Sequence, residues 1–502
     1  MSITLMGFLL FELININEVI KMNKVYITTT IPYVNAKPHI GHALEFVQAD
    51  VLARYYRQTG SNVRFQTGTD ENALTNVLAA RVQGIEPQEL VNRNSAFFQN
   101  LCEALKISND EFIRTTEKRH EGAVQYFWTQ LNPEDLFLKS YSGLYCTGCE
   151  DFYLERDLVD GVCPDHGTKP VIVEEENYFF RLSSYQQQLA ELISSGKIRI
   201  YPETRKEEIL NFIQGGLHDI SISRSTKRSG NWGIRVPGDP SQVIYVWIDA
   251  LINYLSGIGY GNSNRWKSFW NTGTKKVHVI GKNVWKFHAV YWPALLISAG
   301  LPVPDEIVIH GFLTEKGQKI SKSKGNTIDP ITLIDQYGPD AVRYSLLSNA
   351  SPFSDWDFST EKLEASHNNN LANGLGNLIS RVTTLCHRAG YGRYEDRSTI
   401  SDFKGIHDVI QSYSYEKALK IIWEKITKIN QDIDRKKPWV LLNEGKLPEL
   451  RARLTEWLNV ISGIRCALSP FLPDTSERIS GILSQNPIIP APVLFPKIKT
   501  DL

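Results

Sequence analysis

This sequence has few cysteines, no long apolar run and no excess of charge of either sign. Six cysteines among 502 residues are too few for a disulfide scaffold, and three of them fall between positions 146 and 163. No run of about 18 apolar residues occurs, so no membrane span is expected. Lysine plus arginine equals aspartate plus glutamate, 55 each, so no whole-chain basic field marks a nucleic-acid partner. The length and composition are those of a globular protein with about two to four domains.

The first 21 residues differ from the rest of the chain. They are apolar but contain Glu12 and Glu18, and they have neither a basic start nor a small-residue cleavage site. They therefore do not resemble a signal peptide. Met22 directly precedes the first clear strand pattern, so we interpret residues 1–22 as an extension from an upstream start codon. A weak targeting or docking helix is the alternative.

Two strand-turn-helix units follow this extension. Residues 24–31 are β-branched and aromatic, and they lead through a turn into a helical pattern that begins near His42. A second strand is expected at 62–67, followed by a loop and an apolar-periodic helix from Leu74. Together the units predict an α/β fold with a Rossmann-like, doubly wound parallel sheet.

After the second unit the pattern changes twice. From about 140 to 181 it is irregular and rich in Cys, Gly and Pro, which predicts an insertion that splits the sheet. Strand patterns at 242–248, 276–280 and 306–310 indicate that the sheet then resumes. Beyond about Asp357 the helical period dominates, which predicts a separate α-helical bundle.

The segment Pro38-His39-Ile40-Gly41-His42 lies between the first strand and its helix. Unpaired backbone N–H groups and the helix dipole favour an anion at such a place. The imidazoles of His39 and His42 can donate to phosphate oxygens, and Gly41 allows the backbone to approach closely. A histidine pair alone can equally be structural, so this motif by itself leaves both interpretations open.

A basic loop is expected far downstream, at Lys319-Ile320-Ser321-Lys322-Ser323-Lys324-Gly325. Ammonium groups on such a loop can close over a triphosphate and neutralise a departing pyrophosphate. An isolated basic loop is usually only solvated, so its pairing with the histidine motif carries the functional interpretation.

A metal site is predicted within the insertion. Cys146 and Cys149 form one short-spaced pair, and Cys163 and His166 form a second pair after a hairpin-sized interval. Three thiolates and one imidazole match a closed tetrahedral zinc knuckle. Because no open ligand position is implied, the single Zn²⁺ is expected to be structural and to stabilise an insert that lacks a core of its own.

The two phosphate motifs, HIGH at 39–42 and KISKS at 319–323, resemble those of the class I aminoacyl-tRNA synthetases in order and separation. The resemblance implies that His39, Gly41 and His42 contact the phosphates of Mg²⁺-bearing ATP. It also implies that Lys322 stabilises the transition state of adenylate formation, that Lys319 assists it, and that Ser323 belongs to the ATP site.

The length of chain between the two motifs limits which amino acid such an enzyme could activate. There is no space for the large editing insertion of the leucyl, isoleucyl and valyl enzymes, so methionyl and cysteinyl types remain. The segments at 31–35, 245–254 and 280–293 resemble the methionyl family, which also carries a zinc-bearing insert, whereas the cysteinyl type uses zinc to grip its substrate thiol. The resemblance assigns the methionine site to Ile31, Tyr33, Asp70, Trp247, Tyr254, Val284, His288 and Trp292. An aromatic box suits a thioether, which has no strong hydrogen-bonding group, although aromatic stripes are more often core.

One segment departs from the family pattern. Where Gly-Thr-Asp-Glu-His-Gly is expected, this chain has Gly68-Thr69-Asp70-Glu71-Asn72-Ala73. Asp70, which would hold the substrate amino group, is kept, but the histidine and glycine are replaced. A diverged paralogue that uses another amino acid or serves another pathway is therefore an alternative to the housekeeping enzyme.

The helical region contains a pattern that resembles the family's anticodon-recognition site. Asn373, Asn377 and Arg381 are spaced by four residues and are expected on one helix face. Amide groups and a guanidinium suit unstacked bases, and Trp439 could supply a stacking surface. Without the resemblance, an interhelical contact and a core tryptophan would be the preferred interpretation.

The resemblance thus implies a methionine-tRNA ligase of the short form, without the C-terminal tRNA-binding domain, that binds ATP, L-methionine and tRNA(Met). We expect a cytoplasmic monomer that does not associate with a membrane. A catalytically silent RNA-binding protein is a second alternative. The expected division is an N-terminal extension (1–22), a first catalytic half (23–138), an insertion with the knuckle (139–234), a second catalytic half (235–312), a KMSKS loop and stem-contact region (313–365) and an anticodon-binding bundle (366–502).

Overall fold

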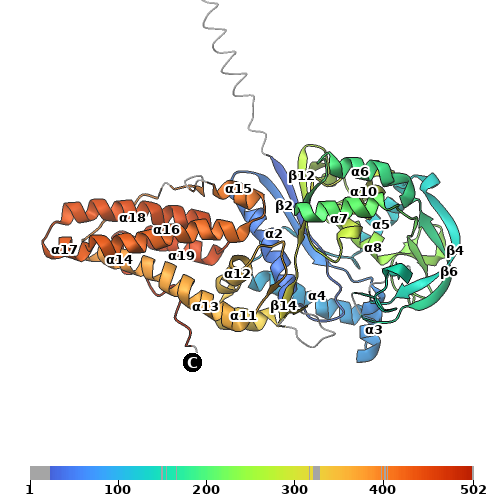
Figure 1. The fold of residues 1–502 in the computed structure, drawn as a ribbon, viewed down its shortest axis with the longest axis horizontal. Coiled ribbons are helices and arrows are strands. Elements are labelled where there is room, and N and C mark those ends of the chain that lie inside the picture. The colour runs from blue at the N-terminus through green and yellow to red at the C-terminus, as the bar shows by residue number, and fades with distance from the viewer. Residues whose placement is uncertain are drawn as a thin grey trace, which may run out of the picture.

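The structure is a computed structural model. It describes residues 23–499 apart from 149–150, 154, 165–166, 316, 320–327, 397, 401–402 and 404. Figure 1 shows the parallel sheet in the middle, the antiparallel strands β4 and β6 on the right, and the long helices α14, α16 and α18 on the left. None of the helices in the described part of the chain is both long and apolar enough to span a membrane.

The central sheet is entirely parallel, as the sequence predicts. Its strands, in spatial order, are β3 (Glu111–Arg114), β2 (Asn62–Thr69), β1 (Lys24–Thr29), β12 (Thr274–Gly281), β13 (Glu306–His310) and β7 (Arg199–Tyr201). Strands on one side of the β1–β12 pair come from the first part of the chain, and those on the other side come later. The pair is therefore the point at which the winding reverses, and ligands bind beyond the carboxyl ends of the strands at such a point.

Helices cover both faces of this sheet and its ends. They are α2 (Ile40–Gln58), α3 (Leu74–Gln83), α4 (Pro87–Ala104), α5 (Lys118–Gln130), α6 (Gln186–Ser194), α7 (Glu203–Gln214), α8 (Val246–Leu251), α9 (Asn253–Ser256) and α10 (Trp292–Ser298). Helix α10 is preceded by a π-helical turn, η5 (Phe287–Tyr291). The expected helix near His42 thus begins two residues earlier, and the helix expected from Leu74 begins there.

The insertion is built on antiparallel pairing. One sheet contains β5 (Asp151–Tyr153), β4 (Leu136–Cys146), β6 (Val171–Phe180) and β8 (Ile220–Ser221), and a second contains β10 (Arg235–Val236), β11 (Asp239–Ile244) and β9 (Ser223–Ser225). The prediction that 242–248 is a strand of the resumed parallel sheet is wrong. Its first half belongs to β11 of the antiparallel sheet, and helix α8 begins at Val246. A short apolar run does not distinguish a strand from a buried helix.

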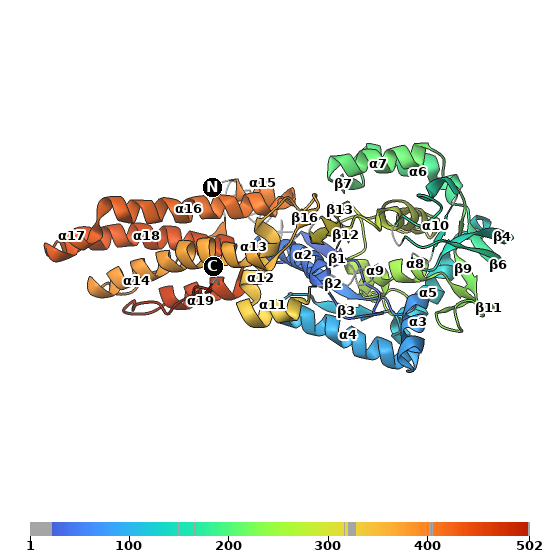
Figure 2. The ribbon, with the colours of Figure 1, turned by 60° about the horizontal axis from the view of Figure 1, so that its bottom comes forward.

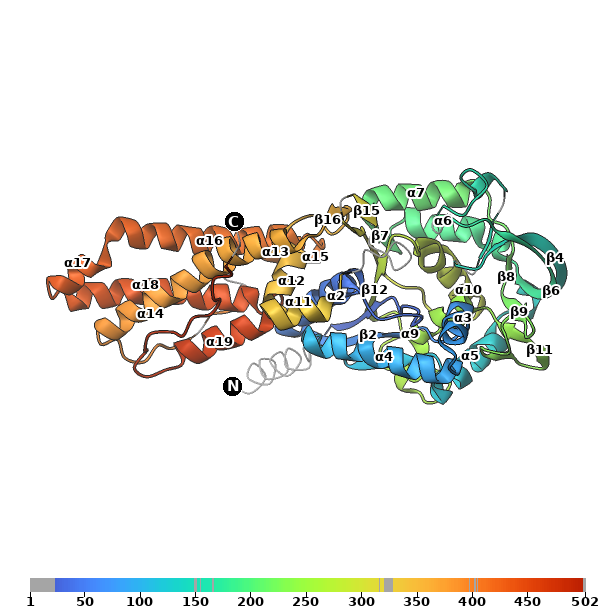
Figure 3. The same ribbon diagram turned by 90° about the horizontal axis from the view of Figure 1, so that it is seen from below.

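The late part of the chain is helical, as predicted. Its helices are α11 (Pro330–Tyr337), α12 (Pro339–Ser348), α13 (Thr360–Ser366), the π-helical η7 (His367–Gly376), α14 (Asn377–Arg388), α15 (Ile406–Gln411), α16 (Tyr415–Lys436), α17 (Pro438–Asn443), α18 (Leu447–Leu468) and α19 (Pro473–Leu483). Short strands β14 (Leu313–Glu315), β15 (Gln318–Lys319) and β16 (Trp356–Asp357) lie between this region and the main sheet. Figures 2 and 3 show α16 and α18 running side by side away from the sheet.

A buried ion pair joins the two regions. Arg343 of α12 lies 2.7 Å from the Asp50 carboxylate of α2, and both side chains are fully buried. The same guanidinium donates to the carbonyl oxygens of Leu105, Pro470 and Phe471 at 2.7–3.1 Å. Burial raises the pKa of Asp50, but the neighbouring arginines lower it further, so the net pKa is below its ordinary value. The helices are thereby anchored to the back of the sheet.

Candidate active site

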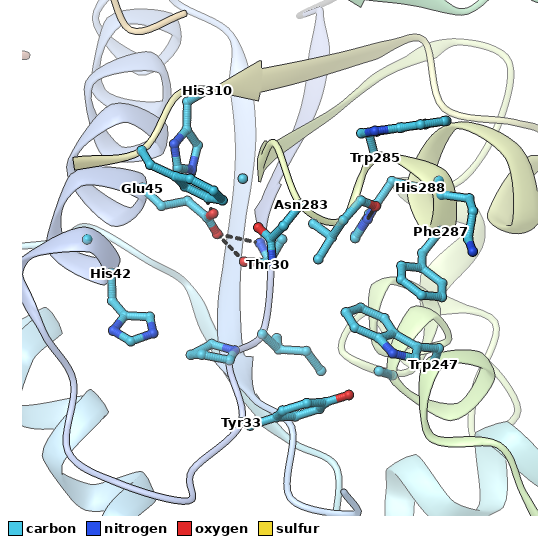
Figure 4. Close-up of a pocket in the computed structure, with 18 of the residues that line it drawn as sticks. Thr30, Tyr33, His42, Glu45, Trp247, Asn283, Trp285, Phe287, His288 and His310 are labelled. Carbon is cyan, nitrogen blue, oxygen red and sulfur yellow. Dashed lines mark hydrogen bonds and ion pairs between the residues drawn. The ribbon is translucent and has the colours of Figure 1, made fainter. Parts of the chain in front are cut away.

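A cavity of about 620 Å³ opens beyond the carboxyl ends of β1 and β12. It is lined by the loop after β1, the start of α2, helices α8 and α9, the segment after β12 and the end of β13. Figure 4 shows Thr30, Glu45 and His310 at one end and Tyr33, Trp247 and Phe287 at the other. The cavity therefore has a polar end beside the HIGH motif and an aromatic end opposite it.

The two histidines of the HIGH motif begin helix α2 and line the cavity. The Nδ1 atom of His39 accepts from the backbone N–H of Gly41 at 3.1 Å, and the Nδ1 atom of His42 accepts from the backbone N–H of His39 at 3.0 Å. Because both Nδ1 atoms accept, the hydrogen of each neutral ring is on Nε2. The reciprocal cap thus fixes two N–H donors beside the positive end of a helix, which suits phosphate oxygens.

A carboxylate and a third histidine at this end were missed by the sequence analysis. Glu45 accepts from the Thr30 backbone N–H at 2.8 Å and from the Thr30 hydroxyl, and its other oxygen lies 2.9 Å from Nε2 of His310. Nδ1 of His310 donates to the Gly311 carbonyl oxygen at 2.8 Å. A signal was present, because Glu45 follows His42 by three residues on one helix face and His310 ends a predicted strand.

The aromatic end contains most of the side chains assigned to methionine. Trp247 stacks on Phe287 at 3.9 Å between ring centroids, and Tyr33 lies 6.0 Å from Trp247. The predicted residues that line the cavity are Ile31, Tyr33, Trp247, Tyr254, Val284 and His288. Phe287 was not predicted, although it directly precedes the predicted His288.

His288 and Tyr254 form a fixed polar pair within this apolar wall. Nδ1 of His288 lies 2.9 Å from the Val284 carbonyl oxygen, which only accepts, and Nε2 lies 2.7 Å from the Tyr254 hydroxyl. Burial lowers the pKa of His288 to about 4 and raises that of Tyr254. His288 is therefore neutral at pH 7, with Nδ1–H donating to Val284 and Tyr254 donating to Nε2.

Two predicted residues lie behind the cavity wall. Trp292 is fully buried against Tyr254, 6.1 Å between ring centroids, and is not among the lining residues. Asp70 is also buried and outside the lining; its backbone N–H donates to the Pro32 carbonyl oxygen at 2.9 Å. That contact places Asp70 directly behind the Tyr33 segment.

The second phosphate motif lies mainly outside the described residues. Lys322 and Ser323 belong to that part, and the backbone of Lys319 pairs with Thr314 in the short β14–β15 hairpin. The chain just beyond the motif returns to the first one, because the Ile328 carbonyl oxygen accepts from the N–H of Ile40 at 3.1 Å. The chain that follows the second motif is therefore hydrogen-bonded to the start of α2.

Comparison with known proteins agrees with this geometry. The family model described as tRNA synthetases class I (M) matches residues 25–169 and 156–383. The chain belongs to the methionyl class I tRNA synthetases. It is 40% identical to the methionine–tRNA ligase of Thermotoga maritima, over 91% of this chain and 74% of that one, and 38% identical to that of Rhizobium meliloti, over 91% of each. A crystal structure of the Mycobacterium tuberculosis enzyme in complex with methionyl-adenylate superposes with a TM-score of 0.87 at 36% identity, covering 95% of this chain and 100% of that one.

The zinc knuckle predicted for this family member is described only in part. Cys146 ends β4, and the Cys163 carbonyl oxygen accepts from the backbone N–H of Gly167 at 2.7 Å. Both cysteines are buried. Cys149 and His166 lie outside the described residues. Among the residues that are described, no cluster of His, Cys, Asp and Glu is arranged to hold a metal. Two buried thiols of the predicted set of four ligands are therefore described, and the zinc site stays a prediction.

The predicted anticodon residues lie on the helices that extend from the sheet. Asn373 and Asn377 are exposed, and Trp439 of α17 is 40% exposed. Arg381 of α14 forms an ion pair with Asp434 of α16. Asn373 lies in the π-helical η7 and the other two in α14, so the simple four-residue spacing assumed from the sequence does not describe this segment. Figure 1 shows α17 at the end of the bundle farthest from the sheet.

Proposed function

We propose that the chain is a methionine–tRNA ligase, which activates methionine with ATP and transfers it to the 3′ end of tRNA(Met). The observation that carries the proposal is a cavity with a histidine-capped helix start at one end and an aromatic wall with its own internal hydrogen bonds at the other. The relatives named above are methionine–tRNA ligases, and one of them was crystallised with methionyl-adenylate.

The proposed chemistry depends on placement and on charge. The methionine carboxylate attacks the α-phosphorus of ATP, pyrophosphate leaves, and the ribose hydroxyl of the tRNA then attacks the adenylate carbonyl and releases AMP. Nε2–H groups of His39 and His42 donate to phosphate oxygens as charge develops, and Mg²⁺ arrives with the nucleotide. Lys322, assisted by Lys319 and with Ser323 nearby in sequence, neutralises the departing pyrophosphate.

At the amino-acid end, the proposed selectivity comes from shape and polarizability. Tyr33, Trp247 and Phe287 present ring surfaces to a thioether, and sulfur-aromatic contacts contribute roughly 0.3–1.5 kcal/mol each. The Tyr254–His288 pair satisfies its own polar atoms, so an apolar side chain meets no unpaired donor there. Ile31 and Val284 fill the wall, Trp292 supports it, and Asp70 is proposed to attract the substrate ammonium group.

The remaining assignments are part of the same proposal. Cys146, Cys149, Cys163 and His166 hold one structural Zn²⁺, and Asn373, Asn377, Arg381 and Trp439 contact the anticodon. The reaction takes place in the cytoplasm, where the tRNA substrate is found. The division of the chain into domains also stays a prediction; within the range 139–234, β7 pairs with β13 of the main sheet.

Replacement of Lys322 by alanine tests the catalytic part of the proposal. Loss of one group that neutralises developing charge is expected to lower the rate of methionine-dependent ATP–pyrophosphate exchange by about 10²–10³. Lys446→Ala is the matched control, because Lys446 is exposed in the helical region and pairs only with Glu444 among the ion pairs described for it. Unaltered exchange in Lys322→Ala would show that the role given to this lysine is wrong.

The second candidate is a methionyl-type paralogue with another amino acid, which the replaced residues Asn72 and Ala73 favour. Both assignments predict adenylate formation, so they differ only in which amino acid supports it. A catalytically silent RNA-binding protein would show no exchange with any amino acid.

A further inference from the structure

Asn72, one of the residues that departs from the family pattern, makes hydrogen bonds on two sides. Its Nδ2 group donates to Oδ2 of Asp249 at 2.7 Å and to the Thr115 carbonyl oxygen at 3.2 Å. The other carboxylate oxygen of Asp249 lies 2.6 Å from Nε2 of His120. Asp249 and His120 are fully buried. The Asp249 carboxylate thus has one donor on each oxygen, and Asn72 supplies one of them.

Asp249 lies on the element that forms one wall of the amino-acid end. It is within α8, whose residues Trp247, Ala250 and Leu251 line the cavity, while Asp249 itself does not. Its carboxylate therefore points behind the wall rather than into it. His120 of α5, through Nδ1, also lies 2.7 Å from the hydroxyl of Ser256 in α9. The carboxylate and this imidazole together hold α8 and α9 from behind.

Asn72 itself lies outside the cavity lining, on the loop between β2 and α3 that also carries Asp70. The neighbouring Glu71 is fixed by a two-atom contact with Arg114, at 2.6 and 3.1 Å, and its carbonyl oxygen accepts from the indole N–H of Trp232 at 2.8 Å. Asp70, two residues before Asn72, is joined to the cavity-lining Pro32 through the backbone. The loop that carries Asn72 is therefore held by contacts on both sides of Asn72 and is hydrogen-bonded to the wall segment that contains Ile31 and Tyr33.

We propose that Asn72 is a positioning residue for amino-acid selection. Its amide ties the α8–α9 wall to the Ile31–Tyr33 wall and so sets the width of the aromatic end of the cavity. Position 72 requires a neutral hydrogen-bond donor, because the side chain there faces the buried carboxylate of Asp249. This inference rests on the proposed function, since it assumes that the aromatic end of the cavity holds the methionine side chain.

The test exchanges the hydrogen-bond donor and acceptor between positions 72 and 249. Asn72→Asp keeps the shape but removes the amide donor to Asp249 and Thr115, and it places two carboxyl groups at hydrogen-bond distance, of which both can be ionised only at a cost in free energy. The KM for methionine in ATP–pyrophosphate exchange is expected to rise about tenfold or more, while the KM for ATP changes by less than about twofold. The double variant Asn72→Asp/Asp249→Asn restores one donor and one acceptor to the pair. It is expected to lower the methionine KM by at least about threefold relative to Asn72→Asp, with incomplete recovery because the hydrogen bond to the Thr115 carbonyl oxygen stays lost.

Asn177→Asp is the matched control. Asn177 is also fully buried and faces a carboxylate, with Nδ2 3.4 Å from Oε2 of Glu175, but it lies in β6 and outside the cavity lining. It should lower thermal stability and leave the methionine KM unchanged. An unchanged methionine KM in Asn72→Asp, or a raised methionine KM that the double variant does not lower, would overturn the inference. Absence of methionine-dependent exchange in the unsubstituted chain would instead overturn the proposed function, and this assignment with it.

Discussion

The sheet region and the helical region stabilise their interiors in different ways. Beside the cavity, the Tyr26 hydroxyl donates to Gln66 at 2.8 Å, and Gln66 donates to the cavity-lining Asn253 at 2.8 Å, with all three side chains buried. Between the long helices the interior is largely aliphatic. Its side chains include Ile422, Ile426, Ile429 and Ile433 of α16 and Leu450, Leu454, Leu458 and Ile461 of α18.

The polar interior of the sheet region and the aliphatic interior of the helical region suit two different tasks. A buried polar group requires its partner at a fixed distance and angle, so each such group restricts where its neighbours can lie. Aliphatic packing tolerates changes of similar volume at small cost. The sheet region is therefore built to position atoms, whereas the helical region is built to hold exposed residues such as Asn377 and Trp439 at a distance from the sheet.

The largest effect is expected where the two regions meet. Arg343→Met leaves the buried Asp50 carboxylate without its main counter-charge and three carbonyl oxygens without a donor. The free energy of unfolding, measured by urea denaturation, should fall by about 3–5 kcal/mol. Arg54→Met is the control, because Arg54 contacts the same carboxylate from a partly exposed position and should cost less. Equal losses in both variants would contradict the distinction.

A pH titration should separate the polar interior from the aliphatic one. His288 has a pKa of about 4 in the folded chain and about 6.5 when unfolded. Between these values the unfolded chain binds a proton that the folded chain does not, so stability falls as pH decreases from about 6.5 to about 4. The contribution is about 3 kcal/mol. His288→Asn should lack this part of the pH dependence, and an identical pH profile in the variant would show that His288 is not held neutral.

The smallest effect is expected in the helical interior. Ile426→Val removes one methyl group from the buried aliphatic interior of the helical region, so the free energy of unfolding should fall by about 0.5–1.5 kcal/mol. The KM values for methionine and ATP should not change, because the residue is far from the cavity in the fold. A raised methionine KM in this variant would contradict the prediction that packing in the helical region does not affect the cavity.

The parallel sheet and the helical region could be predicted because their periodic patterns are long. Strands at 24–29 and 62–69 and the helix after His39 follow the expected order. Register and sheet membership could not be predicted for short runs such as 242–248, where tertiary contacts decide between strand and helix.

The candidate site shows the same limit. His39 and His42 were found because a contiguous motif marks them. Glu45, Phe287 and His310 belong to no such motif, and only the fold brings Glu45 and His310 together across 265 positions. Asp70 and Trp292 were assigned to the pocket by resemblance, but the structure places both behind its lining, because resemblance reports which residues matter and not which surface they present.

The most direct test of the account is ATP–pyrophosphate exchange with each of the twenty amino acids, followed by charging of total tRNA with those that react. The account predicts that methionine has the highest kcat/KM, by at least about 100-fold over cysteine and leucine, and that it alone is transferred to tRNA. A higher kcat/KM for another amino acid, or no exchange with any of them, would contradict it.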